Sequence, residues 1–262
     1  MTSVFDIPII NYHKISDQPD VGITSRKPQD FFDDLSLLAD LGYRTVTFRQ
    51  LALKEALPAK PLILTFDDGY KSVLENAFPV MDKFGFTGVV YIPTDYIGKF
   101  NDWDVQFGGR KFAHLSGSDL QFLHRHGFEI GSHGCSHRSL LALDDQTAKD
   151  ELNESKKKIE HIINDRVYSI SYPFGRFNAA LLRYAVESGY RFGVASIFLF
   201  KKWRLNGLAP LAVRRLNVYR MDSANALIRK VQKQFQSALA YRDWIIQKGS
   251  LATVAWQKWF KK

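Results

Sequence analysis

Short apolar runs alternate with segments of helical spacing along most of this 262-residue chain, and the alternation constrains its fold more than any other feature. Apolar runs predict strands at residues 7–12, 44–48, 62–66, 89–92, 129–131, 168–172, 191–195 and 213–218. Amphipathic spacing predicts helices between them at residues 28–41, 48–57, 71–84, 118–126, 144–163 and 178–188. Such alternation implies a parallel sheet, and about seven repeats favour a closed α/β barrel over an open sheet.

The composition is compatible with one large domain, because barrels of this class reach this length undivided and 45% of the residues are hydrophobic. The single cysteine, Cys135, excludes an internal disulfide, and we expect it to be a packing residue. The sequence does not begin with the basic region and apolar region that mark a signal peptide. No apolar run reaches the roughly 18 residues of a membrane span. We therefore expect a cytoplasmic protein, or an extracytoplasmic one if a signal sequence was removed.

Two adjacent carboxylates, Asp67 and Asp68, follow the predicted strand 62–66 directly and precede Gly69. Two histidines four residues apart, His133 and His137, follow the predicted strand 129–131. The carboxyl ends of barrel strands meet at one mouth, so we expect these groups to converge there. Alone, each motif could be an ordinary turn, and their conjunction is what indicates a site.

One carboxylate and two imidazoles form a facial ligand set that leaves metal positions open for water and substrate. The second carboxylate is then free to act as a base, which predicts a metal-dependent hydrolase. A non-haem iron oxygenase uses the same ligand types. The strand–helix alternation and the spare carboxylate argue against that alternative, as oxygen-independent turnover would.

Two further strand ends carry chemistry at the same predicted rim. The first strand ends on Tyr12 and His13, and the strand 168–172 runs into Tyr172, Pro173 and Phe174. The connection 94–116, which contains Trp103, is long for a compact domain and is either a functional loop or poorly ordered. Four other histidines are expected to be surface or helix residues without a role: His114, His124, His126 and His161.

Positive charge concentrates near the C-terminus. From residue 201 onward the chain has 14 Lys and Arg but only two acidic residues, whereas the whole chain carries a net charge of +9. Trp244, Trp256 and Trp259 lie in the same segment, and this combination favours an anionic membrane surface. A solvated terminal helix whose Trp residues pack on the body is an equal alternative. We expect no nucleic-acid partner.

At this point the motifs resemble a known family. Residues 65–69 (TFDDG) and 133–137 (HGCSH) are similar to the first two signatures of the NodB-type polysaccharide deacetylases, carbohydrate esterase family four, and residues 172–175 (YPFG) resemble the third. The resemblance implies a distorted (β/α)7–8 barrel. It places a deacetylase catalytic domain at residues 1–220 and leaves a basic, Trp-containing helical extension at 221–262.

The resemblance also assigns roles. It implies that Asp68, His133 and His137 bind a divalent metal, zinc in most members. Asp67 would be the catalytic base, and the backbone N–H of Phe174 would help form the oxyanion hole. Aromatic and neighbouring residues along a groove would contact the sugar: Tyr12, Tyr172, Pro173, Trp103 and Arg215.

The sequence departs from the common family pattern at two points. Ser171 stands where an arginine usually braces the base, and no histidine follows His161 to serve as the late catalytic acid. Both departures resemble the circularly permuted branch that contains poly-N-acetylglucosamine deacetylases, in which an N-terminal Tyr-His strand end supplies the acid, here His13. Arg215 is then a candidate brace, although Arg214 is adjacent and strand alternation would point only one of them inward.

The expected reaction is removal of acetyl groups from N-acetylated amino sugars of a cell-surface or exopolysaccharide, or its precursor. In this reaction His13 would protonate the departing amine. An O-acetyl esterase acting on xylan or another glycan is the main alternative. A non-catalytic glycan-binding protein is a further one, and the sequence does not separate N- from O-deacetylation.

Overall fold

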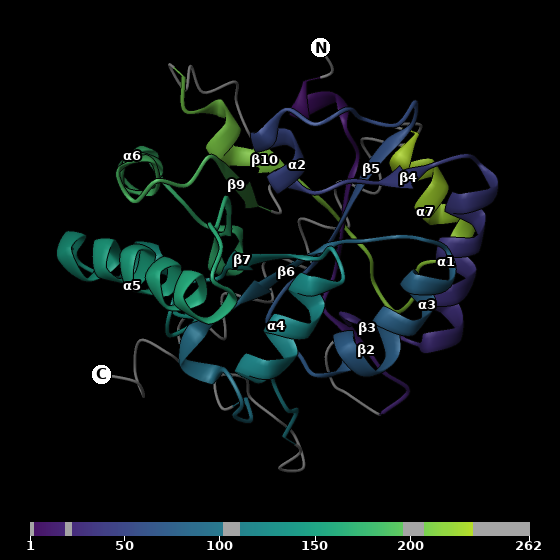
Figure 1. The fold of residues 1–262 in the computed structure, drawn as a ribbon, viewed down its shortest axis with the longest axis horizontal. Coiled ribbons are helices and arrows are strands. Elements are labelled where there is room, and N and C mark those ends of the chain that lie inside the picture. The colour runs from purple at the N-terminus through teal and green to yellow at the C-terminus, as the bar shows by residue number, and fades with distance from the viewer. Residues whose placement is uncertain (1–2, 19–22, 102–110, 196–206, 233–262) are drawn as a thin grey trace.

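The computed structural model describes residues 3–18, 23–101, 111–195 and 207–232. These residues form a parallel barrel surrounded by helices (Figure 1). The predicted Trp103 contact and the Trp residues near the C-terminus lie outside the described residues.

All strand pairs of the barrel are parallel, in the order β10-β9-β8-β7-β6-β5-β1-β11. The strands are β1 (Ile9–Tyr12), β5 (Pro61–Phe66), β6 (Val89–Ile92), β7 (Glu129–Ser132), β8 (Ser169–Ser171), β9 (Phe192–Ala195), β10 (Val213–Arg214) and β11 (Leu216–Asn217). The short strand β4 (Arg44–Thr45) pairs with the start of β5, and β2 (Lys14–Ile15) pairs with β3 (Ser25–Arg26). The predicted α/β barrel is confirmed.

The final strand was predicted as one segment, 213–218, and the structure divides it at Arg215. Its first half, β10, pairs with β9, whereas its second half, β11, pairs with β1. The backbone N–H of Arg215 still donates to Ala195 O at 3.2 Å. One short segment must reach both edges of the sheet to bring them together, and it therefore cannot keep a regular ladder with either.

The helices cover the outside of the barrel, with α1, α3 and α7 on one flank and α5 and α6 on the other (Figure 1). Their bounds are α1 (Pro28–Asp40), α2 (Phe48–Leu53), α3 (Phe78–Lys83), α4 (Gly117–Arg125), α5 (Asp145–Ile163), α6 (Ala179–Glu187) and α7 (Ala224–Val231). Side-chain caps from Thr47, Ser116, Asp144, Asn178 and Ser223 begin five of them.

The predicted helix 71–84 begins with a wider turn. Val73–Ala77 forms a π-helical stretch in which Phe78 N donates to Val73 O, and α3 follows. Pro79 has no N–H to donate to Glu75 O, so a regular α-helix through this position would leave that carbonyl without its partner. A π-helical stretch is a common adjustment at such a point.

Alternation along the strands separates two cores. Even-numbered strand residues, such as Ile10, Leu64 and Ile170, pack with the surrounding helices. Odd-numbered residues at the start of the strands, such as Ile9, Ile63 and Val89, join Val194 in an apolar plug inside the barrel. Farther along the same strands the odd-numbered positions become polar. The interior is therefore apolar at one end and polar toward the mouth.

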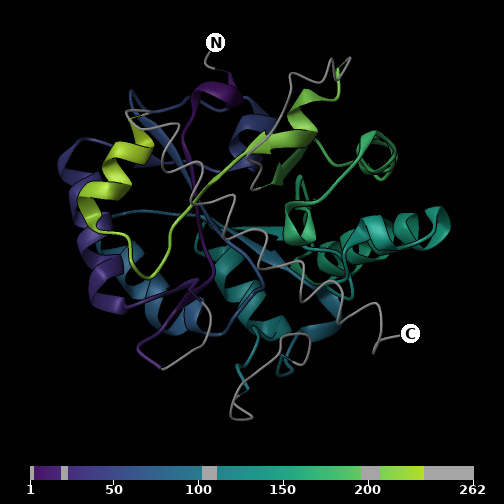
Figure 2. The same ribbon diagram turned by 180° about the vertical axis from the view of Figure 1, so that it is seen from behind.

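The last described helix, α7, packs beside α1 in both views (Figures 1 and 2). Leu227 and Val231 are buried in the same core as the barrel strands, and Lys230 forms a buried ion pair with Asp222 at 2.7 Å. The first residues of the predicted extension 221–262 therefore pack on the barrel, and the domain boundary at 220 stays a prediction. Within the described residues no helix combines the length and apolar character needed to cross a membrane.

Candidate metal centre and catalytic site

Asp67 and Asp68 both face the barrel mouth although they are neighbours in the sequence. Asp67 continues the inward alternation of β5, and its N–H donates to Tyr12 O at 3.0 Å. Asp68 leaves the strand with a left-handed backbone, at φ 69°. Gly69 follows at φ 61°, where a Cβ would lie 2.7 Å from Ile92 Cδ1. The TFDDG turn thus delivers two adjacent carboxylates to one site, because its backbone breaks strand alternation.

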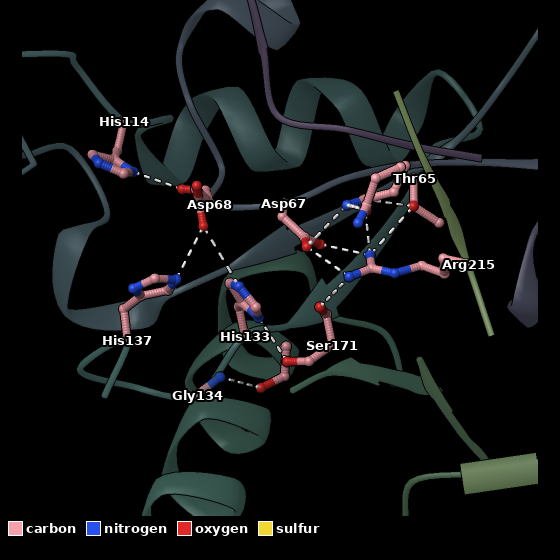
Figure 3. Close-up of polar contacts among 12 residues, drawn as sticks. Thr65, Asp67, Asp68, His114, His133, Gly134, His137, Ser171 and Arg215 are labelled. Atoms are coloured by element: carbon pink, nitrogen blue, oxygen red, sulfur yellow. Dashed lines mark hydrogen bonds and ion pairs between the residues drawn. The ribbon is translucent and has the colours of Figure 1, made fainter. Parts of the chain in front are cut away.

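Asp68, His133 and His137 form a group that could hold a metal ion. One oxygen, Asp68 Oδ1, lies 3.1 Å from His137 Nε2 and 3.5 Å from His133 Nε2 (Figure 3). The three ligand atoms lie within 4.8 Å of one another, and all three residues are buried. The sequence motifs therefore converge as predicted, on one oxygen and two nitrogen donors.

The chemistry of this donor set fits a divalent metal. His133 Nδ1 lies 2.6 Å from Ser171 O, and a carbonyl can only accept, so the ring donates there and turns Nε2 toward Asp68. Nε2 donates to Asp68 when the imidazole is protonated and offers a lone pair to a metal when it is neutral. Burial on its own would raise the pKa of Asp68, but hydrogen bonds from His133 and His137 hold it well below its usual range. A charged carboxylate facing two imidazole nitrogens is a suitable zinc ligand set.

Glu151 of α5 shapes the loop between the two histidines. Its Oε2 accepts from Cys135 N at 2.5 Å and from Ser136 N at 3.1 Å, and its Oε1 accepts from the Ser136 hydroxyl. Gly134 adopts φ 75°, and a Cβ there would lie 2.9 Å from Glu151 Oε2. Three donors on one carboxylate fix the course of the loop, and through it the relative placement of the histidines.

Asp67 is held by Arg215. Arg215 Nη1 donates to Asp67 Oδ1 at 2.7 Å and Nη2 donates to Oδ2 at 2.6 Å, a bidentate pair (Figure 3). Nη2 also donates to Ser171 Oγ at 2.9 Å, and Nη1 donates to Asn11 Oδ1 at 2.9 Å. The guanidinium thus approaches Asp67 from the break between β10 and β11 and contacts Ser171, which stands where the family pattern has arginine.

The electrostatics keep Asp67 ionised. Burial on its own would raise the pKa of Asp67, but the charge of Arg215, together with His133, lowers it from 3.8 to about 2. Of the two adjacent arginines, Arg215 is 4% exposed and faces inward, whereas Arg214 is exposed. Strand alternation therefore points Arg215, and not Arg214, at the carboxylate.

Replacing Arg215 with methionine is expected to raise the pKa of Asp67, because burial would then act without the compensating charge. The acidic limb of the pH profile of kcat/KM should move to higher pH, and kcat/KM at neutral pH should fall by about 10- to 100-fold. The depressed pKa stabilises the fold above pH 3.8, and this contribution is lost as the pH falls through about 2. At neutral pH the variant should also unfold more easily, by roughly 3–5 kcal/mol.

Arg214→Met is the matched control for this variant, since it removes the same charge one position away on the exposed side. It should keep the wild-type pH profile. An Arg215→Met profile that coincides with wild type would show that Arg215 does not set the state of Asp67.

His13 follows β1 directly. It is two residues after Asn11, so strand alternation directs both side chains to the barrel interior. Burial lowers the pKa of His13, and the charges of Asp68 and Asp67 oppose this shift. Its Nδ1 is buried and has no hydrogen-bond partner among the described residues. The predicted rim histidine is therefore within electrostatic reach of both carboxylates, with a nitrogen left for another partner.

Phe174 and Pro173 follow β8 in a short turn. Phe174 adopts a left-handed backbone at φ 58°, and its ring centroid lies 5.1 Å from that of His137. Pro173 is buried. The turn therefore lies beside the candidate metal ligand His137, in agreement with its expected position at the mouth.

Three predicted sugar contacts are corrected by burial. Tyr12 is 0% exposed and its hydroxyl donates to Asp34 Oδ2 at 3.0 Å, and Tyr172 is also 0% exposed. Both have even parity, so their rings point toward the helices and not into the mouth. The buried guanidinium of Arg215 is likewise committed to Asp67, which makes it a brace and not a substrate contact.

Sequence reasoning missed three residues that support the site. His114 was expected to be a surface or helix residue, but it is 4% exposed and its Nδ1 lies 2.7 Å from Asp68 O. Asn11 Nδ2 donates to Asp67 Oδ2 at 3.3 Å, and Glu151 binds the histidine loop. Parity with Asp67 could have identified Asn11, whereas no sequence signal links His114 or Glu151 to the motifs.

Comparison with known proteins agrees with this geometry. The family model for polysaccharide deacetylases matches residues 54–193, which include both metal motifs. His13, just beyond β1, and Arg215, between β10 and β11, lie outside the matched segment. The match places the chain among deacetylases and gives no support to the iron oxygenase alternative.

YxkH of Bacillus subtilis strain 168, whose name assigns it to the polysaccharide deacetylases, is 31% identical over 195 residues, which are 72% of this chain and 64% of YxkH. The poly-beta-1,6-N-acetyl-D-glucosamine N-deacetylase of Staphylococcus aureus strain MSSA476 is 24% identical over 53% of this chain and 49% of its own. The chain thus spans about half to two thirds of the length of these relatives.

A solved structure extends the similarity to the fold. The Streptococcus pyogenes deacetylase PplD, in complex with acetate, superposes with a TM-score of 0.71 at 23% identity and covers 86% of this chain and 97% of its own. At this identity the likeness concerns the barrel alone. The matched family model and the converging motifs together establish that this chain belongs to the polysaccharide deacetylase family.

Proposed function

We propose that this protein is a metal-dependent deacetylase that removes acetyl groups from N-acetylated amino sugars of a cell-surface or exopolysaccharide, or of its precursor. The observation that carries the proposal is that two groups lie side by side at the barrel mouth. One is the buried donor set of Asp68, His133 and His137, and the other is the carboxylate of Asp67, which is paired with Arg215. The N-acetylglucosamine specificity in the name of the staphylococcal relative supports the choice of an N-acetylated sugar.

Asp68, His133 and His137 would hold the metal, and zinc suits one carboxylate and two imidazoles. Bound there, the ion would supply Lewis acidity to the acetyl carbonyl and lower the pKa of water. The chain's own contribution is to fix these three ligands by the left-handed turn at Asp68 and by the contact between His133 and Ser171. The remaining positions would stay open for the acetyl group and water.

Asp67 is the proposed general base. Its carboxylate is ionised and held on two sides by Arg215, so it can accept a proton from water but cannot swing toward the metal ligands. As water attacks the acetyl carbon, negative charge develops on the carbonyl oxygen. The backbone N–H of Phe174, in the turn that packs on His137, is the proposed donor to that oxygen.

His13 is the proposed general acid. An amine leaves a tetrahedral centre readily only when its nitrogen is protonated, and an imidazole at the opposite side of the mouth from the Phe174 turn could supply that proton. This role is supported by the buried Nδ1 of His13, which has no hydrogen-bond partner among the described residues, and by the influence of the Asp68 and Asp67 charges on its pKa. Products would be acetate and a free amino sugar.

Replacing His13 with alanine is expected to leave bound metal unchanged and to lower kcat on amide substrates by about 10² to 10⁴. Activated esters should lose less, because their leaving group departs without a proton. The two substrate classes are compared by acetate release, with metal content measured on the same samples. Wild-type amide hydrolysis in this variant would assign the proton to another group.

The substrate class is tested by acetate release from a panel of N-acetylated and O-acetylated glycans, including β-1,6-linked N-acetylglucosamine oligomers and acetylated xylan. The proposal expects turnover on the N-acetylated members. Turnover on acetylated xylan alone would establish the O-acetyl esterase alternative. Binding of these glycans without acetate release would establish the non-catalytic alternative.

We also propose that the basic segment from residue 201 onward holds the protein at an anionic membrane surface. The support is its charge, 14 basic residues against two acidic ones, since each Lys or Arg near such a surface contributes on the order of 1 kcal/mol. Arg215, Lys230 and Asp222 belong to this count but are buried in ion pairs, so the other members would make the contact. Co-sedimentation with phosphatidylserine vesicles should exceed that with neutral vesicles and should fall as salt is added. Equal recovery with both vesicle types would reject the proposal.

A further inference from the structure

The segment 111–115 straps the turn that carries the two carboxylates. Lys71 N donates to Ala113 O at 2.8 Å, and Leu115 N donates to Gly69 O at 2.9 Å. Between these two backbone bonds, His114 Nδ1 lies 2.7 Å from Asp68 O (Figure 3). The strap therefore contacts the peptide group of a proposed metal ligand through a side chain, in addition to its backbone bonds on either side.

The imidazole of His114 is fixed by its surroundings. The residue is 4% exposed, and its ring centroid lies 4.9 Å from that of Tyr70 and 5.7 Å from that of Tyr96. One ring nitrogen, Nδ1, lies 2.7 Å from the carbonyl oxygen of Asp68, and a hydrogen bond between them needs one proton. Asp68 O can only accept, which places that proton on Nδ1.

This hydrogen bond acts at one of the left-handed non-glycine residues of the described site, which are Asp68, His137 and Phe174. Asp68 is a non-glycine residue at φ 69°, a conformation that persists only where neighbours hold it. The bond to His114 fixes the orientation of the 68–69 peptide, and with it the backbone path from Asp68 into Gly69. Carbonyl and carboxylate of Asp68 are joined through one Cα, so a fixed carbonyl limits the backbone movement through which the carboxylate could leave His133 and His137.

We propose that His114 is a positioning residue, which holds Asp68 in its metal-binding conformation by donating the Nδ1 hydrogen bond to its carbonyl. This inference rests on the proposed function, because it assumes that Asp68 binds the metal. His114 itself does not contact the metal or the reacting atoms. The hydrogen bond acts through Asp68, and the packing of the ring only places the donor.

Two variants separate the hydrogen bond from the packing. His114→Phe keeps an aromatic ring against Tyr70 and Tyr96 but has no donor. His114→Asn removes the ring but keeps an amide N–H near the position of Nδ1. His126→Phe is the matched control, because His126 Nδ1 also lies 2.8 Å from a carbonyl, Phe122 O, and its ring stacks on Phe122 at 4.1 Å, away from the site.

The measurement is Zn²⁺ affinity of the full chain, by competition with a chromogenic chelator, together with the Tm of each metal-free variant. His114→Phe should bind Zn²⁺ roughly 10-fold more weakly than wild type, as is typical for loss of an outer partner of a metal ligand. His114→Asn and His126→Phe should stay within about threefold of wild type. A role in packing alone predicts the reverse order, with Asn the weaker binder.

Equal affinity of His114→Phe and wild type would overturn the inference, as would equal losses in the Phe and Asn variants. If the Phe variant does not fold, His114→Leu removes the same donor with a smaller side chain. A Leu variant with the same Zn²⁺ affinity as the Asn variant would also overturn the inference. Failure of the wild-type chain to bind Zn²⁺ at all would instead reject the proposed function. The two failures are therefore distinguishable.

Discussion

Replacing Asp68 with alanine is expected to abolish both bound metal and acetate release. Asp68 Oδ1 is the atom that both histidines face, at 3.1 and 3.5 Å, and it supplies the only anionic donor of the three. Without it two neutral imidazoles remain, so metal affinity should fall by at least about 10², the upper range for loss of even an outer-shell partner. Metal content after dialysis and acetate release are measured on the same preparation.

Asp40→Ala is a suitable control, because it removes an exposed carboxylate at the end of α1. It should retain wild-type metal content and turnover. An Asp68→Ala protein that keeps one metal per chain would show that the donor set is misassigned, and full turnover without metal would remove Asp68 from the mechanism altogether.

Replacing Asp67 with asparagine is expected to separate metal binding from catalysis. The substitution keeps the shape of the side chain and leaves Asp68, His133 and His137 intact, so metal content should stay at the wild-type level. An amide cannot accept the proton that a carboxylate accepts, and kcat should fall by about 10² to 10⁴. Metal stoichiometry and single-turnover acetate release distinguish this variant from Asp68→Ala.

The pairing of the two aspartate variants matters more than either alone. A loss of metal in Asp67→Asn would mean that the two carboxylates share the ligand role. Wild-type turnover with metal in place would mean that the base lies elsewhere. The account expects neither outcome, because Arg215 holds Asp67 by both oxygens and so keeps it from the ligand set.

Much of the fold follows from local pattern. The strand 89–92 was predicted with the bounds of β6, and the strand 62–66 differs from β5 only in Pro61, because continuous apolar runs between turns are typical of buried parallel strands. The helices 144–163 and 178–188 match α5 and α6 closely, since capping residues begin both. The division of the final strand and the π-helical stretch before α3 were missed, because they arise from barrel closure and from one proline.

The metal motifs could be located because each follows a strand directly, and parallel strands end at one mouth. To place side chains just before the mouth, one must also know whether the odd or the even residues of each strand face the barrel interior. Tyr12 and Tyr172 adjoin site residues in sequence but have the opposite parity, and both are buried in the helix layer. Counting alternate residues from Asp67 would have placed them correctly.

His114 and Glu151 could not be predicted from the chain alone. Each reaches the site from an element distant in sequence, and each contacts backbone atoms, which carry no residue-specific signal. The choice between Arg214 and Arg215 likewise needed the register at which the last strand crosses from β9 to β1. Such contacts depend on tertiary placement, which local pattern does not encode.

The central claim is tested most directly by acetate release from an N-acetylglucosamine oligomer before and after the wild-type protein is stripped of metal. The account predicts that chelation reduces turnover to the level of the Asp68→Ala protein, and that about one equivalent of Zn²⁺ per chain restores it. Undiminished acetate release from fully stripped protein would contradict the account.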